Sequence, residues 1–206
     1  VIAWTTPELS ANQIAEKMKA LAAHRSQLES APAYLRSFVR RNELFGNLPP
    51  VVLVSQDPDV TPEPETFPGS DIPDERLTDE EKAGFIGIEK RWTALQDGNL
   101  VIRIQLSRPL AQEVALSVFA FGYRHDVPFP KMPKIHVRWD ALGATVQDQT
   151  VPVAPETVIL ERTARELKAS IPLALLGQPE RLLTSARTAL GDIPMDWISW
   201  RTVEIH

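Results

Sequence analysis

Cysteine is absent from the 206-residue sequence, and glycine is scarce, with only nine residues. Without cysteine the chain can form no disulfide, no thiolate metal site and no thiol nucleophile. The sequence also has no glycine-rich loop of the kind that cradles a phosphate and no serine in a nucleophile elbow. These absences exclude the common signatures of nucleotide-binding proteins and of serine- or cysteine-dependent enzymes.

A surplus of basic residues is missing as well. The 22 basic and 27 acidic residues give a formal net charge of −5, which argues against a general nucleic-acid binder because such proteins rely on a basic surface. Small molecules, glycans and proteins remain as partners. Ordinary proportions of apolar residues (43%) and charged residues (24%) predict a packed core.

Long apolar runs are also missing. No stretch approaches the roughly 20 residues that a membrane span needs, and no charged-then-apolar signal peptide opens the chain, so we expect no membrane span. The localisation stays undetermined, since a chain without cysteine suits either redox compartment. Residues 1–7, which begin with Val1, have the composition of a protein interior, so we expect that an upstream segment was removed.

What the sequence contains is strand pattern, centred on residues 98–123. In the first of two runs, four apolar residues alternate with mostly polar ones: Leu100, Ile102, Ile104 and Leu106. A period of two places them on one buried face. The second run, residues 114–123, is apolar on both sides, which is typical of a central strand covered on both faces. We predict that the two runs pair at the centre of an antiparallel β domain.

The rest of the C-terminal part continues in short strands separated by turns. Residues 96–99 (Gln-Asp-Gly-Asn) have strong turn chemistry, and Lys134–Trp139 alternates so that His136 lies on a polar face between two cations, which should keep it neutral. Further strands are predicted at residues 85–92, 144–153, 157–161, 165–171, 182–190 and 197–205. Eight or nine such strands favour a two-sheet antiparallel β-sandwich over residues 83–206.

Helical pattern is confined to the N-terminal part. Ser10 and Gln13 have the spacing of a capping box that opens a helix, and apolar residues follow at helical intervals: Ile14, Met18, Leu21 and Leu28. A second helix is predicted to begin at Pro32 and to end at Gly46. Such a helical hairpin, residues 1–47, is too small to form a core alone and must pack on something else.

A proline-rich acidic segment separates the two parts. Seven prolines fall within residues 49–73, and ten acidic residues against one arginine fall within residues 57–81. Proline at this density excludes helix and central strand, so we predict a solvated linker over residues 48–82. Residues 51–54 and Phe67 are apolar, so part of this segment can lie against a domain.

The N-terminal segment carries a resemblance to a known family. Residues 17–27, KMKALAAHRSQ, resemble the K-x-x-A-L-x-x-H-x-S-Q segment near the end of the catalytic domain of PIG-L (LmbE-like) zinc deacetylases, and residues 34–46, YLRSFVRRNELFG, resemble the tail that follows. The family hydrolyses the acetyl group of N-acetylglucosamine-type sugars, using zinc held by an Ala-His-Pro-Asp-Asp-Glu motif. The resemblance implies that the hairpin completes a separate α/β domain. The zinc motif is absent here, so zinc and every catalytic residue would belong to a missing N-terminal segment or chain.

The C-terminal part carries a second resemblance. Leu167 onward through IPLALLG to DIPMDWISWR is similar to the closing section of the family-9 carbohydrate-binding and DOMON groups, whose modules bind sugars or haem. Aromatic rings can stack on sugars, and loops at sheet ends often carry function. The candidate ligand-binding residues are Tyr123, Arg124, His125 and Trp200. Trp139 and Trp197 fall on apolar-facing positions and are predicted to be core, whereas Trp92 and Trp200 are freer to be exposed.

Three functions therefore stay open. The first is the C-terminal accessory part of a zinc-dependent deacetylase acting on amino sugars or glycoconjugates. The second is a non-catalytic module that binds carbohydrate or protein. The third is a haem-binding redox subunit, whose axial ligands would come from four residues: His125, His136, Met132 and Met195.

Overall fold

The computed structural model describes residues 3–30, 35–36, 39–43, 45–47, 51–53, 62–66 and 78–205. The chain divides into two compact units, an N-terminal unit (Val1–Pro49) and a C-terminal unit (Pro50–His206). Strands dominate the described residues, so the protein is mainly β, as the sequence predicts. No helix among the described residues is long and apolar enough to span a bilayer.

The N-terminal unit contains two helices and a small sheet. Helix α1 (Ala11–Ala22) begins at Ser10, where the backbone N–H of Ser10 donates to Gln13 Oε1 (2.8 Å) and the N–H of Gln13 donates to Ser10 Oγ (3.3 Å). The predicted capping box is confirmed. Helix α2 (Arg25–Ser30) follows after a break at residues 23–24, so the first helical pattern forms two helices.

The predicted second helix is wrong in its later part. Leu35 and Arg36 are helical, but residues 39–43 are not, and Phe45–Asn47 forms strand β2, which pairs antiparallel with β1 (Ala3–Thr5). Backbone hydrogen bonds between residues far apart in the sequence replace helical ones here: the Leu9 N–H donates to Arg41 O at 2.8 Å. Gly46 does not end a helix, because it lies inside β2 opposite Trp4. Glycine fits there because a Cβ would lie 2.8 Å from the Trp4 ring. Pro32 and Phe38 lie outside the described residues.

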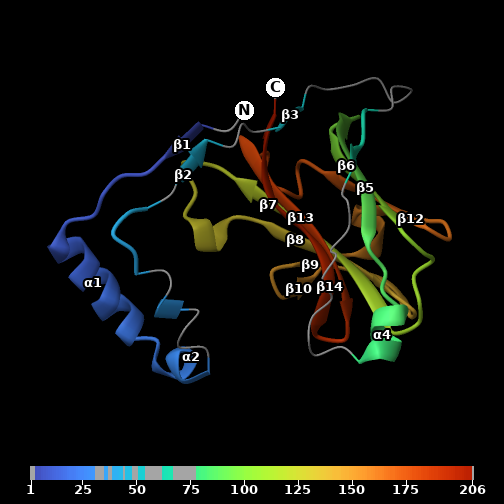
Figure 1. Cartoon of the computed structure of the whole chain (residues 1–206). Coiled ribbons are helices and arrows are strands. Elements are labelled where there is room, and N and C mark those ends of the chain that lie inside the picture. The colour runs from blue at the N-terminus through green and yellow to red at the C-terminus, as the bar shows by residue number, and fades with distance from the viewer. Residues whose placement is uncertain are drawn as a thin grey trace. The chain divides into compact units, whose positions relative to one another are not determined.

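The C-terminal unit contains two larger sheets. The first has seven strands in the order β10-β9-β8-β7-β13-β14-β3, all antiparallel except the β14–β3 pair; four of them, β8, β7, β13 and β14, run side by side in Figure 1. The strand bounds are β3 Val51–Leu53, β7 Val114–Tyr123, β8 Lys134–Asp140, β9 Gly143–Asp148, β10 Val151–Pro152, β13 Arg181–Leu190 and β14 Ile193–Ile205. Strand β7 lies in the middle of the sheet, as its apolar sequence predicts. The predicted cover on both faces is wrong, because Phe119 and Phe121 are only half-buried and Tyr123 is exposed.

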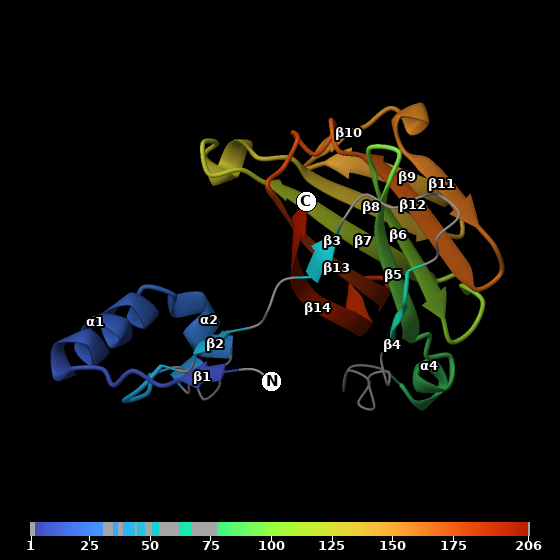
Figure 2. The same cartoon turned by 90° about the horizontal axis from the view of Figure 1, so that it is seen from above.

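The second sheet has five antiparallel strands in the order β11-β12-β6-β5-β4, of which β12, β6 and β5 can be followed in Figure 2. The bounds are β4 Glu65–Thr66, β5 Ile88–Gln96, β6 Asn99–Leu106, β11 Ile159–Arg162 and β12 Glu166–Pro172; helix α4 spans Asp79–Ala83, and 3₁₀ turns occur at Phe129–Lys131 and Pro155–Thr157. The predicted turn between β5 and β6 is confirmed, because Asp97 and Gly98 both have positive φ angles (50° and 73°), as a two-residue hairpin requires.

The predicted pairing of the two central runs is wrong. Strands β6 and β7 lie in different sheets, and β6 pairs with β5 and β12 while β7 pairs with β8 and β13. The predicted alternation in β6 is nevertheless confirmed, since Leu100, Ile102, Ile104 and Leu106 are all buried. Buried residues of both sheets belong to one hydrophobic cluster, so the two runs meet through side chains in the core instead of through backbone hydrogen bonds.

Two pieces of the predicted linker are edge strands. Val51–Leu53 (β3) pairs with the end of β14, and Glu65–Thr66 (β4) pairs with β5. Both strands are short and lie at sheet edges. An edge strand has only one neighbouring strand, so prolines near it can be accommodated without breaking hydrogen bonds to a second strand. The remaining linker residues, including Val54 and Phe67, lie outside the described residues.

Two buried polar side chains connect the seven-stranded sheet to the start of β5. The Asp196 carboxylate, 5% exposed, accepts hydrogen bonds from the backbone N–H groups of Ile88 (2.8 Å) and Trp197 (2.8 Å). Thr188, directly opposite Asp196 on β13, donates to Ile86 O at 2.7 Å. These bonds satisfy backbone groups of residues 86–88, where the chain leaves α4 and enters β5.

Replacing Asp196 is therefore expected to destabilise the C-terminal unit. Asp196→Ala leaves the buried N–H of Ile88 without its acceptor, at a cost of about 2 kcal/mol in the free energy of unfolding. Asp192→Ala, an exposed carboxylate in the adjacent turn, is the matched control and should change that free energy by less than about 0.5 kcal/mol. Chemical denaturation of both variants measures the difference, and equal effects would contradict the role given to Asp196.

Candidate ligand-binding surface

Trp200 reaches the outer face of the seven-stranded sheet because of a β-bulge. Thr184 pairs with Arg201 and Ala186 pairs with Ile198, so Ser199 and Trp200 together oppose the single residue Ser185. A bulge of this kind adds one residue to a strand and re-aims the side chains around it. Trp200 is consequently 49% exposed, although Ile198, two residues earlier, is buried.

Three aromatic rings form a continuous surface with Trp200 on this face. The Trp200 ring lies 4.7 Å from the Phe121 ring and 5.9 Å from the Phe119 ring, measured between centroids. Phe119 in turn stacks on the His136 imidazole at 4.5 Å with an angle of 14° between the planes. We call these four residues, together with Trp197 and Arg187, the aromatic face.

Arg187 and Trp197 continue the aromatic face toward the β13–β14 turn. They are directly opposite each other on β13 and β14, which brings their side chains into contact range. Trp197 is 58% exposed, and the Arg187 guanidinium lies 5.4 Å from the Phe119 ring centroid. Arg187 is exposed and makes no ion pair within the part of the chain that the structure describes.

His136 is held neutral on this face. Burial lowers the pKa of the His136 imidazole, and the positive charges of Arg187 and Arg138 lower it further. Its Nε2 atom shares a hydrogen bond of 2.9 Å with the hydroxyl of the buried Ser117. The sequence predicts a neutral His136 correctly, but burial is the larger cause, and the second cation is Arg187 of β13, on the far side of β7, instead of Lys134.

Two of the tryptophan predictions hold and one is wrong. Trp139 is buried as predicted, and Trp200 is exposed as predicted. Trp197 is exposed instead of buried, because the bulge at Ser199 and Trp200 puts Trp197 and the buried Val203 on opposite faces although six residues separate them. Trp92 is half-buried on the other sheet, where the Arg103 guanidinium covers its ring at 3.9 Å.

The predicted loop residues form a second feature at the end of β7. Tyr123 and His125 line an open pocket of about 410 Å³, and the His125 Nδ1 atom lies 2.5 Å from Glu180 Oε1. Arg124 does not line this pocket; its guanidinium pairs with Asp126 (2.7 Å), which raises the pKa of Arg124 and lowers that of Asp126. Tyr123 shares its sheet face with Phe121, which contacts Trp200, whereas Arg124 and His125 lie in the loop that follows β7. The structure therefore does not bring the four candidates into one site.

The groups His125, Asp126 and Glu180 lie close enough to hold a cation, with ligand atoms within 4.8 Å of one another. All three side chains are exposed, and Asp126 is already paired with Arg124. The cluster is therefore explained by its own ion pairs, and we assign no metal to it.

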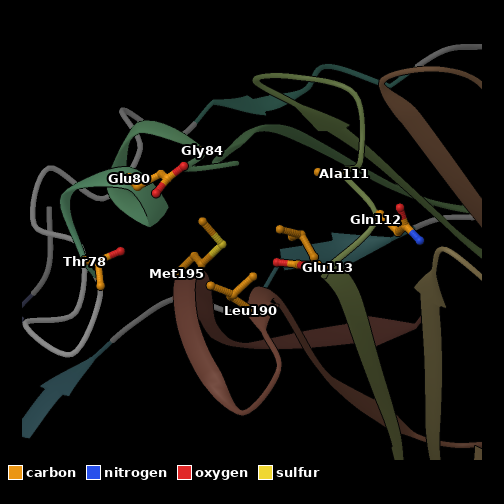
Figure 3. A pocket seen from close by; sticks show the side chains of 9 residues that line it. Thr78, Glu80, Gly84, Ala111, Gln112, Glu113, Leu190 and Met195 are labelled. Carbon is orange, nitrogen blue, oxygen red and sulfur yellow. The ribbon is translucent and has the colours of Figure 1, made fainter.

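The pocket in Figure 3, in the C-terminal unit, has a volume of about 520 Å³. Its floor is apolar, formed by Leu190 and Met195, and Glu80 from α4 and Glu113 from the β6–β7 loop lie on opposite sides of it. Met195 and His125 thus line different pockets, which places two of the four proposed haem ligands apart.

Arg187, Glu180 and Phe119 have no signal in the sequence that marks them as site residues. Strand pairing brings Phe119 and Arg187 next to the candidates, and a loop 55 residues from His125 in the sequence brings Glu180 to it. No family model and no curated protein matches this chain. The site is therefore interpreted from its own geometry.

Removing the cation nearest to the aromatic stack should change the titration of His136. In Arg187→Gln, loss of one positive charge favours the imidazolium, so the His136 pKa rises toward its ordinary value. Proton NMR of the imidazole as a function of pH measures the shift. Arg162→Gln, an exposed arginine on β11 of the other sheet, is the control and should leave the His136 titration unchanged.

The same shift has a consequence for stability. Because the folded-state pKa of His136 is below its unfolded value, the unfolded chain binds more protons in the pH range between the two values. The contribution of His136 to stability is therefore complete above about pH 6.5 and is lost as the pH falls toward the folded-state pKa. The loss should be smaller in Arg187→Gln than in the parent protein, and an unchanged pH dependence would contradict this assignment.

Proposed function

We propose that the chain is the accessory C-terminal part of a zinc-dependent deacetylase of the PIG-L type, acting on N-acetylglucosamine-type sugars. The observation that carries the proposal is in the N-terminal unit. Helix α1 is amphipathic, yet none of its twelve residues is buried, and Met18 is 59% exposed. An amphipathic helix gains most of its stability by packing its apolar side, so this helix needs a partner surface.

A groove beside α1 supports the same proposal. It has a volume of about 340 Å³ and is lined by Arg36 and by five apolar residues: Met18, Leu21, Ala22, Leu28 and Val39. The residues that resemble the deacetylase segment, 17–27, include three of these lining residues. In the proposed assembly the α/β catalytic domain would cover this groove.

The C-terminal unit would then extend the glycan-binding side of the enzyme. We propose that its two sheets form a β-sandwich, which their single shared hydrophobic cluster supports, and that the aromatic face contacts the sugar or the group attached to it. When bound in the catalytic domain, zinc would activate a water molecule against the acetamide carbonyl. No zinc ligand and no catalytic residue is assigned to this chain, because its sequence lacks the His-Pro-Asp-Asp motif.

A second function, carbohydrate binding without catalysis, is favoured by a separate observation. Trp197 and Trp200 are exposed on one sheet face, where Trp200 contacts Phe121, and exposed aromatic rings on a rigid sheet suit the C–H faces of sugar rings. This function requires only the C-terminal unit, whereas the deacetylase proposal also requires a partner for α1.

Met18 distinguishes the two functions. Met18→Lys changes an exposed side chain in the isolated chain, so the melting temperature of this 206-residue chain should stay the same. In the complete natural protein, a catalytic domain covering α1 would bury residue 18, and the same substitution should then destabilise the protein by about 2 kcal/mol or more. Thermal denaturation of both forms measures the effect, with Lys19→Glu as the control for a solvated helix position.

Intact-mass measurement of the natural protein comes first, because it identifies the form in which Met18 must be tested. We expect a mass above 23.0 kDa and a polypeptide that contains the His-Pro-Asp-Asp motif. A natural protein that consists of this chain alone would overturn the deacetylase proposal. A neutral Met18→Lys substitution in a larger natural protein would overturn the docking of α1 on a partner surface.

A further inference from the structure

We propose that the aromatic face binds a carboxylate-bearing sugar, with the sugar ring stacked on Trp200 and Trp197 and the carboxylate bound by Arg187. This inference rests on the glycan contact proposed above and adds the chemical class of the ligand.

The first step is the shape of the stacking surface. Trp200 and Trp197 come from the same strand, β14, and both are about half exposed, at 49% and 58%. Phe119 and Phe121 of β7 support the inner edge of Trp200 at 5.9 Å and 4.7 Å. Large indole rings held by neighbouring aromatic rings on a sheet lose little side-chain freedom on binding, which favours affinity.

The second step is the charge of the face. The aromatic face contains no carboxylate, and neither do Ser117 and Ser185, which lie between its residues on β7 and β13. The nearby ion pairs Arg138–Asp140 and Arg181–Glu204 neutralise the other two arginines of this side of the sheet. Lys134, on the same side, donates to the backbone carbonyls of Phe129 and Met132. Arg187 is an exposed cation of the aromatic face with no ion pair to a described residue, and a planar guanidinium suits bidentate binding of a carboxylate.

The third step is that nearby charges change the pKa of His136, a residue of the aromatic face. The groups that face His136 are Arg187 from β13, Arg138 from its own strand and the uncharged Ser117 from β7, with Gln147 as its register partner on β9. The two cations lower the pKa of His136. A carboxylate placed beside Arg187 would oppose them, so binding should raise this pKa.

The experiment compares three defined probes on the full chain: trigalacturonate, its fully methyl-esterified form and neutral chitotriose. Tryptophan fluorescence and calorimetry measure affinity, and NMR of His136 reports charge at the face. Trigalacturonate should bind about 10-fold or more tightly than its ester, as one charge-assisted pair provides, and only trigalacturonate should raise the His136 pKa.

Variants separate the contributions of the ring and of the charge. Arg187→Gln should remove the preference for trigalacturonate over the ester and leave the weaker affinity of the ester unchanged. Trp200→Ala should weaken all binding by about 10-fold or more. Arg181→Gln, on the same strand but paired with Glu204 (3.2 Å), is the matched control and should retain the preference.

Two outcomes would overturn the inference in distinguishable ways. Equal binding of trigalacturonate, its ester and chitotriose, lost in Trp200→Ala, would leave the glycan contact standing and remove the preference for an acid. No binding of any probe, or binding that Trp200→Ala and Arg187→Gln leave unchanged, would remove the glycan contact at this face as well.

Discussion

The pairing register between β13 and β14 is the constraint on which the rest of the C-terminal unit depends. The register shifts twice, once between Thr188 and Ala189 and once between Thr184 and Ala186. Each shift adds one residue to β14 and exchanges the inward and outward faces of the residues beyond it. As a result Asp196 faces inward to the start of β5, Trp197 and Trp200 face outward, and Val203 returns to the core. The interior anchor and the exposed aromatic face therefore have the same cause.

This constraint also explains how much of the fold could be predicted. Alternation in β6 and β8, the two-sided apolar character of β7 and the Asp97–Gly98 turn are local properties, and the sequence predicts them correctly. Bulges are different, because no residue type in β14 marks where the extra residue enters. Strand partners are also not local, which is why the pattern predicts β6 and β7 as strands but pairs them wrongly. The same holds for β2, whose apolar residues fit a helix as well as a strand until β1 pairs with it.

The candidate site also combines residues that local sequence pattern indicates with residues that only strand pairing brings together. Tyr123, Arg124, His125 and Trp200 could be chosen from the sequence because aromatic residues and a polar loop at a sheet end are visible in it. Their partners could not be chosen, since Glu180 belongs to a loop far from His125 in the sequence, and Arg187 contacts Phe119 from the neighbouring strand of the sheet. The charge of the aromatic face therefore depends on which residues the strand pairing places next to one another. A single arginine without a counter-ion is conspicuous only after the neighbouring arginines are seen to be paired.

The two units expose surfaces of different chemistry, and the difference indicates what each surface is for. The groove beside α1 is lined mainly by apolar side chains. Exposure of such a surface to water is unfavourable in free energy, and a permanent partner removes that exposure. The aromatic face combines indole rings with a guanidinium and an imidazole, groups that tolerate water and still bind a ring-shaped ligand. A surface of the first kind suits a stable assembly, and a surface of the second kind suits a ligand that binds and leaves. An accessory part of a sugar-modifying enzyme needs both, which is why we favour that function over a binding module that uses the aromatic face alone.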